Sequence, residues 1–298
     1  MSTLNDIREL NIGKVISNFE LKNYTTYKVG GKAICGVIPE DEESLIILLE
    51  YLKNNNIKYK VLGNGSNVIF NDSGYNGVII KLDNFKSLKI INNKVIVGSG
   101  YPLNKLAIRV SRLGLTGLEF AAGIPGTVGG AVYMNAGAYK SDIGYVLTSI
   151  IVLTPDYEIK TMYNKELNFH YRSSFLQKNK DYICLEATFT LMKGNPEEIM
   201  ELIDERKKRR LETQPLEYPS AGSVFRNPEG DFAGRLIEEI GYKGKSIGGA
   251  KVSEKHANFI INNGNATGEE IKELINEIKD KIKDKYNIEL KVEQEFVE

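Results

Sequence analysis

The chain has 298 residues, 42% of them apolar, with 39 basic and 39 acidic side chains and therefore no net charge. At roughly 100–200 residues per domain, this length indicates two or three domains with hydrophobic cores. The charge balance argues against nucleic acid or an anionic membrane as a partner. The one basic run, residues 207–210, is typical of a solvated helix face.

Cysteine and histidine usage limits the chemistry further. Cys35 and Cys184 are far apart and have apolar neighbours, which is typical of buried thiols in a reducing compartment. The only histidines are His170 and His256 and there is no CxxC pair, so we expect no metal site. The N-terminus lacks an apolar signal core, and no apolar run approaches the ~18 residues of a membrane helix. These features predict a cytoplasmic protein without a membrane partner.

In chain order, the first two predicted helices cover 41–53 and 102–113, the second with Leu103, Leu106, Ala107, Val110 and Leu113 on one face. Short apolar runs typical of strands surround them, at 58–62, 77–82, 94–98, 149–153 and 182–192. Few helix signals precede residue 195.

Helices dominate after residue 195. They are predicted at 196–211, 231–240 and 267–285, and the last opens with a capping box from Thr267 to Glu270. The apolar stripe of this last helix is predicted to be Ile271, Leu274, Ile275, Ile278 and Ile282. A strand follows at 288–296.

The change in composition near Gly194 and Pro196 places a domain boundary near residue 193. The resulting fold class is α+β, with domains at 1–193 and 194–298. We expect the first to divide into subdomains at roughly 15–82 and 83–193, and the last strand, 288–297, to return toward the first domain.

Two glycine-rich loops, 63–67 and 123–130, carry the strongest functional signal. GNGSNV (63–68) and GSGYPL (98–103) lack the third glycine of a Rossmann fingerprint, and no P-loop ending occurs. Successive N–H groups in such loops can instead bind anionic oxygens as a nest, with Asn64, Ser66, Asn67 and Thr127 as added donors. Tight turns in a β-rich domain are the alternative explanation.

Several longer motifs resemble the UDP-N-acetylenolpyruvoylglucosamine reductases, which are flavoenzymes of peptidoglycan precursor synthesis. The resemblance runs from about residue 20 to residue 296, and the chain is similar to the shorter subtype. Lys140 stands where the family often has glycine, and Arg226 where it often has lysine. The motifs are NYTTYKVGG (23–31), LGNGSNVIF (62–70), GIPGTVGGAVYMNAGAY (123–139), YRSSF (171–175), SAGSVFRNP (220–228) and GGAKVSEKHANFIIN (248–262).

The resemblance implies a FAD-binding region of the vanillyl-alcohol-oxidase type, followed by a smaller α/β substrate-binding domain. It implies non-covalent FAD as cofactor and NADPH as reductant. The residues it implies for cofactor binding are Tyr27, Gly63, Asn64, Gly65, Ser66, Asn67, Gly123, Pro125, Gly126, Thr127, Gly129, Gly130, Ala131, Asn135 and Gly137.

The implied reaction reduces a UDP-sugar enolpyruvyl ether to a lactyl ether, with hydride delivered by the flavin. The resemblance implies Arg172 as the group that stabilises the developing negative charge, Ser223 as the proton donor and Glu293 as a further catalytic residue. Without it, Arg172 reads more readily as a structural arginine, Ser223 as a turn residue and Glu293 as part of a charged strand face. The residues implied for substrate binding are Tyr171, Arg226, Asn227, Lys245 and His256.

Two other functions stay open at this point. The first is a different FAD oxidoreductase of the same fold, and the second is a nucleotide-binding regulatory module without catalysis.

Overall fold

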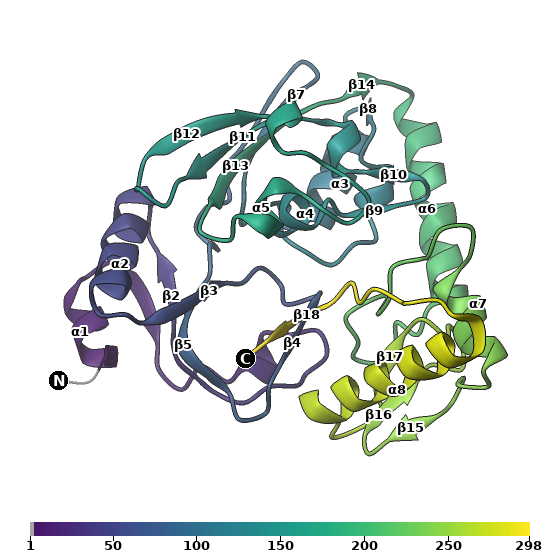
Figure 1. Cartoon of the computed structure of the whole chain (residues 1–298). Helices are drawn as coiled ribbons and strands as arrows, with labels where there is room; N and C mark the ends of the chain where they lie inside the picture. The colour runs from purple at the N-terminus through teal and green to yellow at the C-terminus, as the bar shows by residue number, and fades with distance from the viewer. Residues whose placement is uncertain (1–2) are drawn as a thin grey trace. The chain divides into compact units, whose positions relative to one another are not determined.

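The computed structural model describes residues 3–298 and forms two compact units (Figure 1). The first unit comprises the residues up to Ile16, then Gly36–Asn64 and Val78–Arg209. The second comprises Ser17–Cys35, Gly65–Gly77 and Arg210–Glu298. The chain therefore passes between the units several times, and its last passage lies inside a helix. The predicted domain limits near residue 193 stay a prediction.

The helices of the first unit agree with the predicted ones and add three short ones that lacked a clear sequence signal, α1, α4 and α5. Helix α6 continues into the second unit, which also holds α7 and α8. The helices are α1 (Thr3–Glu9), α2 (Glu42–Asn54), α3 (Leu103–Arg112), α4 (Val128–Met134), α5 (Phe175–Lys178), α6 (Pro196–Thr213), α7 (Ala233–Glu239) and α8 (Gly268–Tyr286), with 3-10 turns at Leu21–Asn23, Glu119–Ala121, Ile143–Tyr145 and Asn164–Glu166.

A five-stranded sheet in the first unit has the order β12-β11-β13-β7-β6, and a four-stranded sheet has the order β1-β2-β5-β3. Their strands are β1 (Gly13–Ile16), β2 (Ala33–Pro39), β3 (Lys58–Val61), β5 (Tyr75–Ile80), β6 (Leu88–Ile91), β7 (Lys94–Gly98), β11 (Leu147–Leu153), β12 (Ile159–Tyr163) and β13 (Ile183–Thr190).

The small sheets are two- or three-stranded. In the second unit, β15-β16-β17 form one sheet, and β18 pairs in parallel with β4, Glu295 opposite Val68. Their strands are β4 (Val68–Phe70), β8 (Leu115–Thr116), β9 (Gly137–Ala138), β10 (Ser141–Asp142), β14 (Met192–Lys193), β15 (Ser246–Ile247), β16 (Ala250–Val252), β17 (Ile260–Asn262) and β18 (Glu295–Val297).

Helix α8 forms as its sequence predicts. Thr267 accepts a hydrogen bond from the N–H of Glu270, and the Glu270 carboxylate accepts from the N–H of Thr267, which completes the capping box. All five residues of the predicted stripe, from Ile271 to Ile282, are fully buried in the core of the second unit. Burial of a side chain of this size stabilises the fold by about 1.5–3 kcal/mol.

Two predicted details are wrong. Leu113 is 60% exposed: α3 ends at Arg112, and Leu113 is its C-cap residue and no part of the buried face. The strand predicted at 288–296 is regular only over Glu295–Val297, with one isolated bridge between Val292 and Phe225. In the segment before it, Gln294 is buried and bonds to Tyr27 and Ala221.

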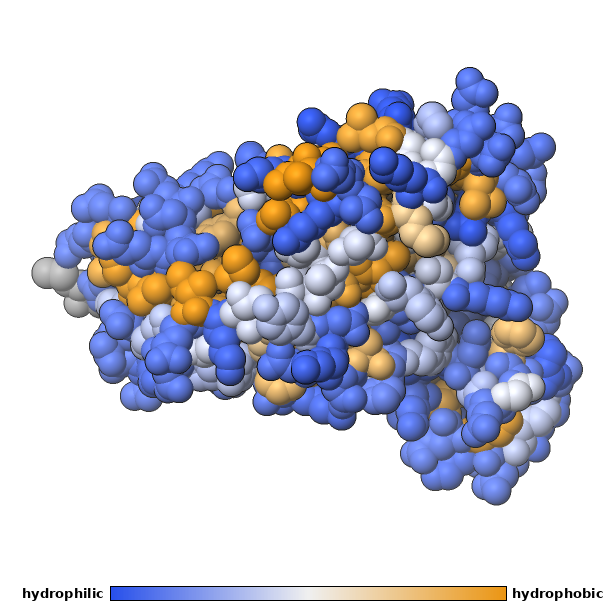
Figure 2. Space-filling view, turned by 90° about the horizontal axis from the view of Figure 1, so that it is seen from above, coloured by the Kyte–Doolittle hydropathy of each residue, from blue (hydrophilic) through white to orange (hydrophobic). Residues whose placement is uncertain are grey.

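Most of the buried apolar side chains belong to two clusters, one in each unit. On the face that Figure 2 presents, apolar residues lie in separate patches among hydrophilic ones. Among the described residues, no helix combines the length and the apolar content needed to cross a membrane.

Candidate functional site

The two glycine-rich loops meet at Gly63 and Thr127, both in the first unit. A Cβ at Gly63 would lie 2.7 Å from Thr127 Oγ1, so only glycine permits this approach. Thr127 caps α4, since its Oγ1 accepts a hydrogen bond from the N–H of Gly130 at 3.2 Å. The first loop is therefore packed directly on the start of α4.

The glycines of the second loop serve different purposes. Gly129 packs on Ser99: its N–H donates to the Ser99 carbonyl at 2.8 Å, and a Cβ there would lie 2.9 Å from Ser99 Cβ. Gly123 and Gly130 are exposed, and a Cβ at Gly130 would meet only Thr127 Oγ1, at 3.4 Å. Close chain packing thus explains Gly129, while an exposed backbone surface remains at Gly123 and Gly130.

The rest of the first loop belongs to the second unit. Gly65 has φ +62°, and a Cβ there would lie 2.2 Å from the Tyr24 carbonyl oxygen. Asn67 Nδ2 donates to the Glu293 carbonyl at 3.1 Å. Tyr27 is buried in the core, and its hydroxyl donates to Gln294 Oε1 at 3.1 Å. Burial raises the pKa of this hydroxyl well above its ordinary value. The contact of Tyr27 with the cofactor stays a prediction, because its side chain already has a structural role.

Arg172 lies in a tight turn of the first unit between His170 and Ser173, whose backbones exchange two hydrogen bonds of 3.0 Å. Its φ is +54°, an uncommon conformation for a residue with a side chain. Its Nη2 donates to the Gly137 carbonyl at 2.6 Å, and its guanidinium lies 5.0 Å from the ring centre of Tyr171. This arrangement fixes the direction of the cation.

The Arg172 turn is anchored on the C-terminal end of α4. Ser174 Oγ and Gln177 Nε2 both donate to the Tyr133 carbonyl, at 2.7 and 3.0 Å. Asn135, with φ +44°, ends the helix, donates from Nδ2 to the His170 carbonyl and accepts from the N–H of Gly144. Helix α4 therefore connects the glycine-rich loop at its start to the arginine turn at its end.

The structure brings Ser223 and Glu293 onto adjacent antiparallel segments of the second unit. The N–H of Glu293 donates to the Val224 carbonyl at 2.8 Å. Gln294 Nε2 donates to the Ala221 carbonyl at 3.1 Å and lies 3.5 Å from the Ser223 carbonyl. Asn67 donates to the Glu293 carbonyl from outside this pair of segments. Three predicted site residues, Ser223, Glu293 and Asn67, therefore lie on or directly beside the pair.

A buried asparagine holds the same segment from its other side. Asn258 accepts from the N–H of Phe225 at 3.0 Å and donates to the Phe225 carbonyl at 2.8 Å. His256, two residues earlier, accepts at Nδ1 from the N–H of Asn258. Burial lowers the pKa of His256, so its ring is neutral at neutral pH.

The remaining predicted substrate residues are Lys245 and the consecutive pair Arg226 and Asn227, and their side chains have different surroundings. Lys245 forms an ion pair with Glu277 of α8, and this hydrogen bond raises the pKa of the lysine. Asn227 is exposed and accepts from the N–H of Ala233 at the start of α7. Arg226 Nε is buried and has no hydrogen-bond partner among residues 3–298.

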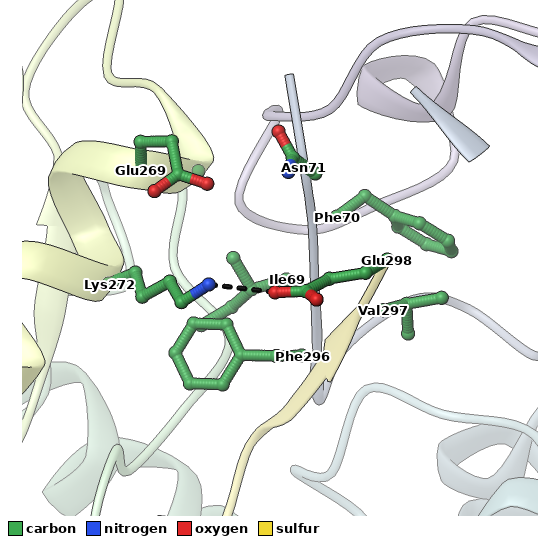
Figure 3. Close-up of a pocket in the computed structure, with 9 residues that line it drawn as sticks. Ile69, Phe70, Asn71, Glu269, Lys272, Phe296, Val297 and Glu298 are labelled. Atoms are coloured by element: carbon green, nitrogen blue, oxygen red, sulfur yellow. Dashed lines mark hydrogen bonds and ion pairs between the residues drawn. The ribbon is translucent and has the colours of Figure 1, made fainter. Parts of the chain in front are cut away.

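A separate hollow in the second unit contains none of the predicted site residues (Figure 3). Lys272 of α8 and Glu298 face each other across it, with Lys272 Nζ 2.7 Å from Glu298 Oε1, and the Phe296 ring lies beside them. This ion pair joins α8 to the residue that follows β18, and both of its side chains are partly exposed.

Comparison with known proteins adds the family. Residues 33–162 match the FAD binding domain, and residues 214–297 match the C-terminal domain of UDP-N-acetylenolpyruvoylglucosamine reductase. The chain is 46% identical over 292 residues to the UDP-N-acetylenolpyruvoylglucosamine reductase of Halalkalibacterium halodurans, covering 98% of this chain and 97% of that one. It is 47% identical to UDP-N-acetylenolpyruvoylglucosamine reductase 1 of Bacillus cereus, covering 99% and 98%.

The chain belongs to the UDP-N-acetylenolpyruvoylglucosamine reductase family. The solved structure of this enzyme from Thermus caldophilus superposes with a TM-score of 0.81 at 34% identity, covering 96% of this chain and 98% of that one. The predicted fold class is thereby confirmed, as is FAD as the cofactor.

The residues of the first unit fit the FAD of this reductase family. Neutral backbone at Gly123 and Gly130 is exposed where the two loops meet, and Asn64 adds an exposed amide. Backbone N–H groups and amides of this kind bind a diphosphate without a nearby lysine side chain in the loop itself. The predicted contacts at Pro125, Gly126, Ala131, Gly137 and Ser66 stay predictions.

Sequence reasoning missed Gln294 and Ser99, although both gave a signal. Gln294 has the same parity as the apolar residues Leu290 and Val292, so alternation places an amide in the core. Ser99 lies in GSGYPL, where the two glycines resemble part of a Rossmann fingerprint. In the structure, Ser99 packs against Gly129. Asn258 gave no comparable signal.

Proposed function

We propose that this chain catalyses the NADPH-driven, FAD-dependent reduction of UDP-N-acetylglucosamine enolpyruvate to UDP-N-acetylmuramate, in peptidoglycan precursor synthesis. The observation that carries the proposal is the family membership over 98% of the chain, with both domain matches in the expected order. A cytoplasmic location fits the two buried free thiols, Cys35 and Cys184.

The loops at 63–67 and 123–130 would hold the FAD diphosphate. Bound FAD supplies the hydride for the methylene carbon of the enol ether and is itself reduced by NADPH. The chain contributes exposed backbone at Gly123 and the amide of Asn64 as neutral donors. Neutral donors suit a diphosphate that stays bound through the reaction cycle, because their geometry is fixed before the ligand arrives.

Arg172 would stabilise the negative charge that develops beside the substrate carboxylate. One of its terminal nitrogens already donates to Gly137, which sets the orientation of the guanidinium. A guanidinium can bind a carboxylate through a pair of parallel hydrogen bonds, and this attraction grows as negative charge spreads into the carboxylate. The rigid turn around Arg172 removes the need to order the side chain during the reaction.

Ser223 would deliver the proton to the carbon beside the carboxylate. A serine hydroxyl is a poor acid, so the alkoxide needs stabilisation or a proton resupplied through a chain. The Ser223 segment is held at fixed positions by Gln294 and Asn258, which keeps the hydroxyl in place. Glu293, on the paired segment, would polarise the enolate carboxylate when it is protonated.

The UDP part of the substrate would be bound by Tyr171, Arg226, Asn227, Lys245 and His256. His256 would act as a neutral hydrogen-bonding group, because its Nδ1 already accepts from Asn258. Lys245 would have to exchange its partner Glu277 for a phosphate oxygen. Its contribution to affinity should therefore be smaller than that of an unpaired lysine.

Absorbance spectroscopy on the purified chain tests the proposed function. We expect a flavin spectrum that bleaches with NADPH and recovers after addition of UDP-N-acetylglucosamine enolpyruvate. Bleaching without recovery would indicate a different FAD oxidoreductase. A colourless protein that does not take up FAD would contradict flavin chemistry altogether.

A further inference from the structure

Lys81 is a buried cation of the first unit that the proposed chemistry does not use. It directly follows β5 and is 7% exposed. Its Nζ donates to the Gly63 carbonyl at 2.9 Å and lies 3.4 Å from Asp83 Oδ1, on a carboxylate whose side chain is 45% exposed. Burying an ammonium group is costly, so a lysine here is a poor choice for packing alone.

The strand ends bring Lys81 to the first glycine-rich loop. The N–H of Leu62 donates to the Ile80 carbonyl at 2.9 Å, so the residues that follow, Gly63 and Lys81, are neighbours where β3 and β5 end. Thr127 closes on Gly63 from the second loop. The Gly63 peptide is thus held by Lys81 at its oxygen and by Thr127 at its Cα.

Holding this oxygen also fixes the next N–H group. The peptide between Gly63 and Asn64 is planar and trans, so its N–H points away from its carbonyl oxygen. Because the oxygen is turned toward the buried Lys81, the Asn64 N–H is turned away from it, on a residue that is exposed. A hydrogen bond from an ammonium group to the carbonyl also polarises the N–H of the same peptide.

We propose that Lys81 is a positioning residue for FAD: it aims the Gly63–Asn64 peptide at the cofactor diphosphate and adds a buried positive charge behind the loop. This inference rests on the proposed function, since it needs FAD as the ligand. Lys81 acts through Gly63 and is not a catalytic residue.

The test measures the dissociation constant of FAD from the full-length holoprotein, using the rise in flavin fluorescence on release. For Lys81→Met we expect a roughly 10- to 100-fold weaker affinity, the range for a hydrogen bond to a charged group. Lys81→Arg keeps the charge and a donor, so we expect it to restore binding to within about threefold of the unsubstituted chain. The control is Lys89→Met, an exposed lysine of β6, which should bind FAD unchanged.

A second measurement separates positioning from folding. The melting midpoint of flavin-free Lys81→Met should stay within a few degrees of that of the flavin-free unsubstituted chain, because the cost of leaving the Gly63 carbonyl without its donor is offset by removal of a buried charge. A purely structural lysine would instead lower the midpoint and the affinity together. An affinity of Lys81→Met within threefold of the unsubstituted chain, or no restoration by Lys81→Arg, would overturn the proposal.

A further variant decides the matter if Lys81→Met does not fold. Asp83→Asn removes the exposed counter-charge, so FAD should bind about two- to tenfold more tightly; unchanged or weaker binding would contradict a role for the Lys81 charge. An unsubstituted chain that holds no FAD would contradict the proposed function itself. A chain that turns over normally while Lys81→Met binds FAD as before would contradict only the role of Lys81.

Discussion

Ser223 lies on a segment whose position is set by other side chains. The adjacent Gly222 has φ +74°, and a Cβ there would meet no atom within 4 Å, so the backbone beside Ser223 borders open space. Gln294 and Asn258 hold the carbonyls on either side of this opening. The structure therefore leaves room beside Ser223, while the backbone that carries this residue is held in place.

Removal of the Ser223 hydroxyl should slow the second half of the reaction only. In Ser223→Ala we expect NADPH to reduce the flavin at its normal rate, while the enolpyruvyl substrate reoxidises it about 10²- to 10⁴-fold more slowly, the usual contribution of a general acid. Stopped-flow absorbance separates the two steps. The control is Ser246→Ala on β15, an exposed serine that should behave normally. Unimpaired reoxidation in Ser223→Ala would remove this residue from the mechanism.

Arg172 and Glu293 are proposed to stabilise the transition state, so their substitution should affect kcat more than KM. Arg172→Ala and Glu293→Gln should lower kcat by more than they raise KM, by about 10²-fold or more for the arginine. Arg172→Lys should recover only part of the loss, because an ammonium group cannot bind both Gly137 and a carboxylate with the same fork. A change confined to KM would make these residues binding groups.

His256 should make stability depend on pH. Burial lowers its pKa below the ordinary value of 6.5, so below that pH the unfolded chain binds a proton that the folded chain resists. The contribution of His256 to the free energy of unfolding is therefore fully present above pH 6.5. It decreases as the pH falls toward the folded-state pKa. The urea midpoint of the unsubstituted chain should drop more between pH 7.5 and pH 5.5 than that of His256→Gln. Equal drops in both proteins would show that His256 titrates normally.

At the scale of elements, capping and periodicity predicted the helices whose signals are local. The capping box and stripe of α8 are as the sequence indicates, because both depend on residues three or four apart. Helix α4 was not predicted, since VGGAVYM contains two glycines, which disfavour helices. It forms because Thr127 caps it and the Arg172 turn satisfies the Tyr133 carbonyl at its end, both tertiary features.

The paired segments 221–227 and 291–294 depend on one buried amide. Gln294 accepts from Tyr27 and donates to Ala221, so Gln294→Ala leaves a buried hydroxyl and a buried carbonyl without partners. We expect a loss of about 2–4 kcal/mol in the free energy of unfolding, measured by urea titration. Tyr27→Phe removes only one donor and should cost about 1 kcal/mol. A neutral Gln294→Ala would mean that this amide does not hold the Ser223 segment.

At the scale of the whole molecule, the chain divides into units that its order does not reveal. Segments 17–35 and 65–77 belong with the C-terminal residues rather than with their neighbours in sequence. The first glycine-rich loop therefore changes units between Asn64 and Gly65. Composition along the chain can indicate only where one stretch of sequence ends and another begins. The compact units are instead defined by contacts between segments that are distant in sequence.

Removal of FAD should lower the thermal stability of the whole chain. A ligand that binds only the folded state stabilises it by about 2.7 kcal/mol at 100 times its dissociation constant. The melting midpoint of the flavin-free chain should thus lie several degrees below that of the holoprotein, and added FAD should restore it in proportion to the logarithm of its concentration. Identical midpoints with and without FAD would contradict binding to the folded chain.

The sequence alone determined the features that depend on near neighbours or on long shared motifs: the main helices, five of the longer strands, the α+β class and the family with its FAD cofactor. Tertiary structure decided why particular residues stand where they do. Gly63 and Gly129 are glycines because distant segments, at Thr127 and Ser99, pack against them. Gln294 and Lys81 acquire their hydrogen-bond partners only when distant segments come together, and a local pattern that places a residue in the core does not say what it will contact.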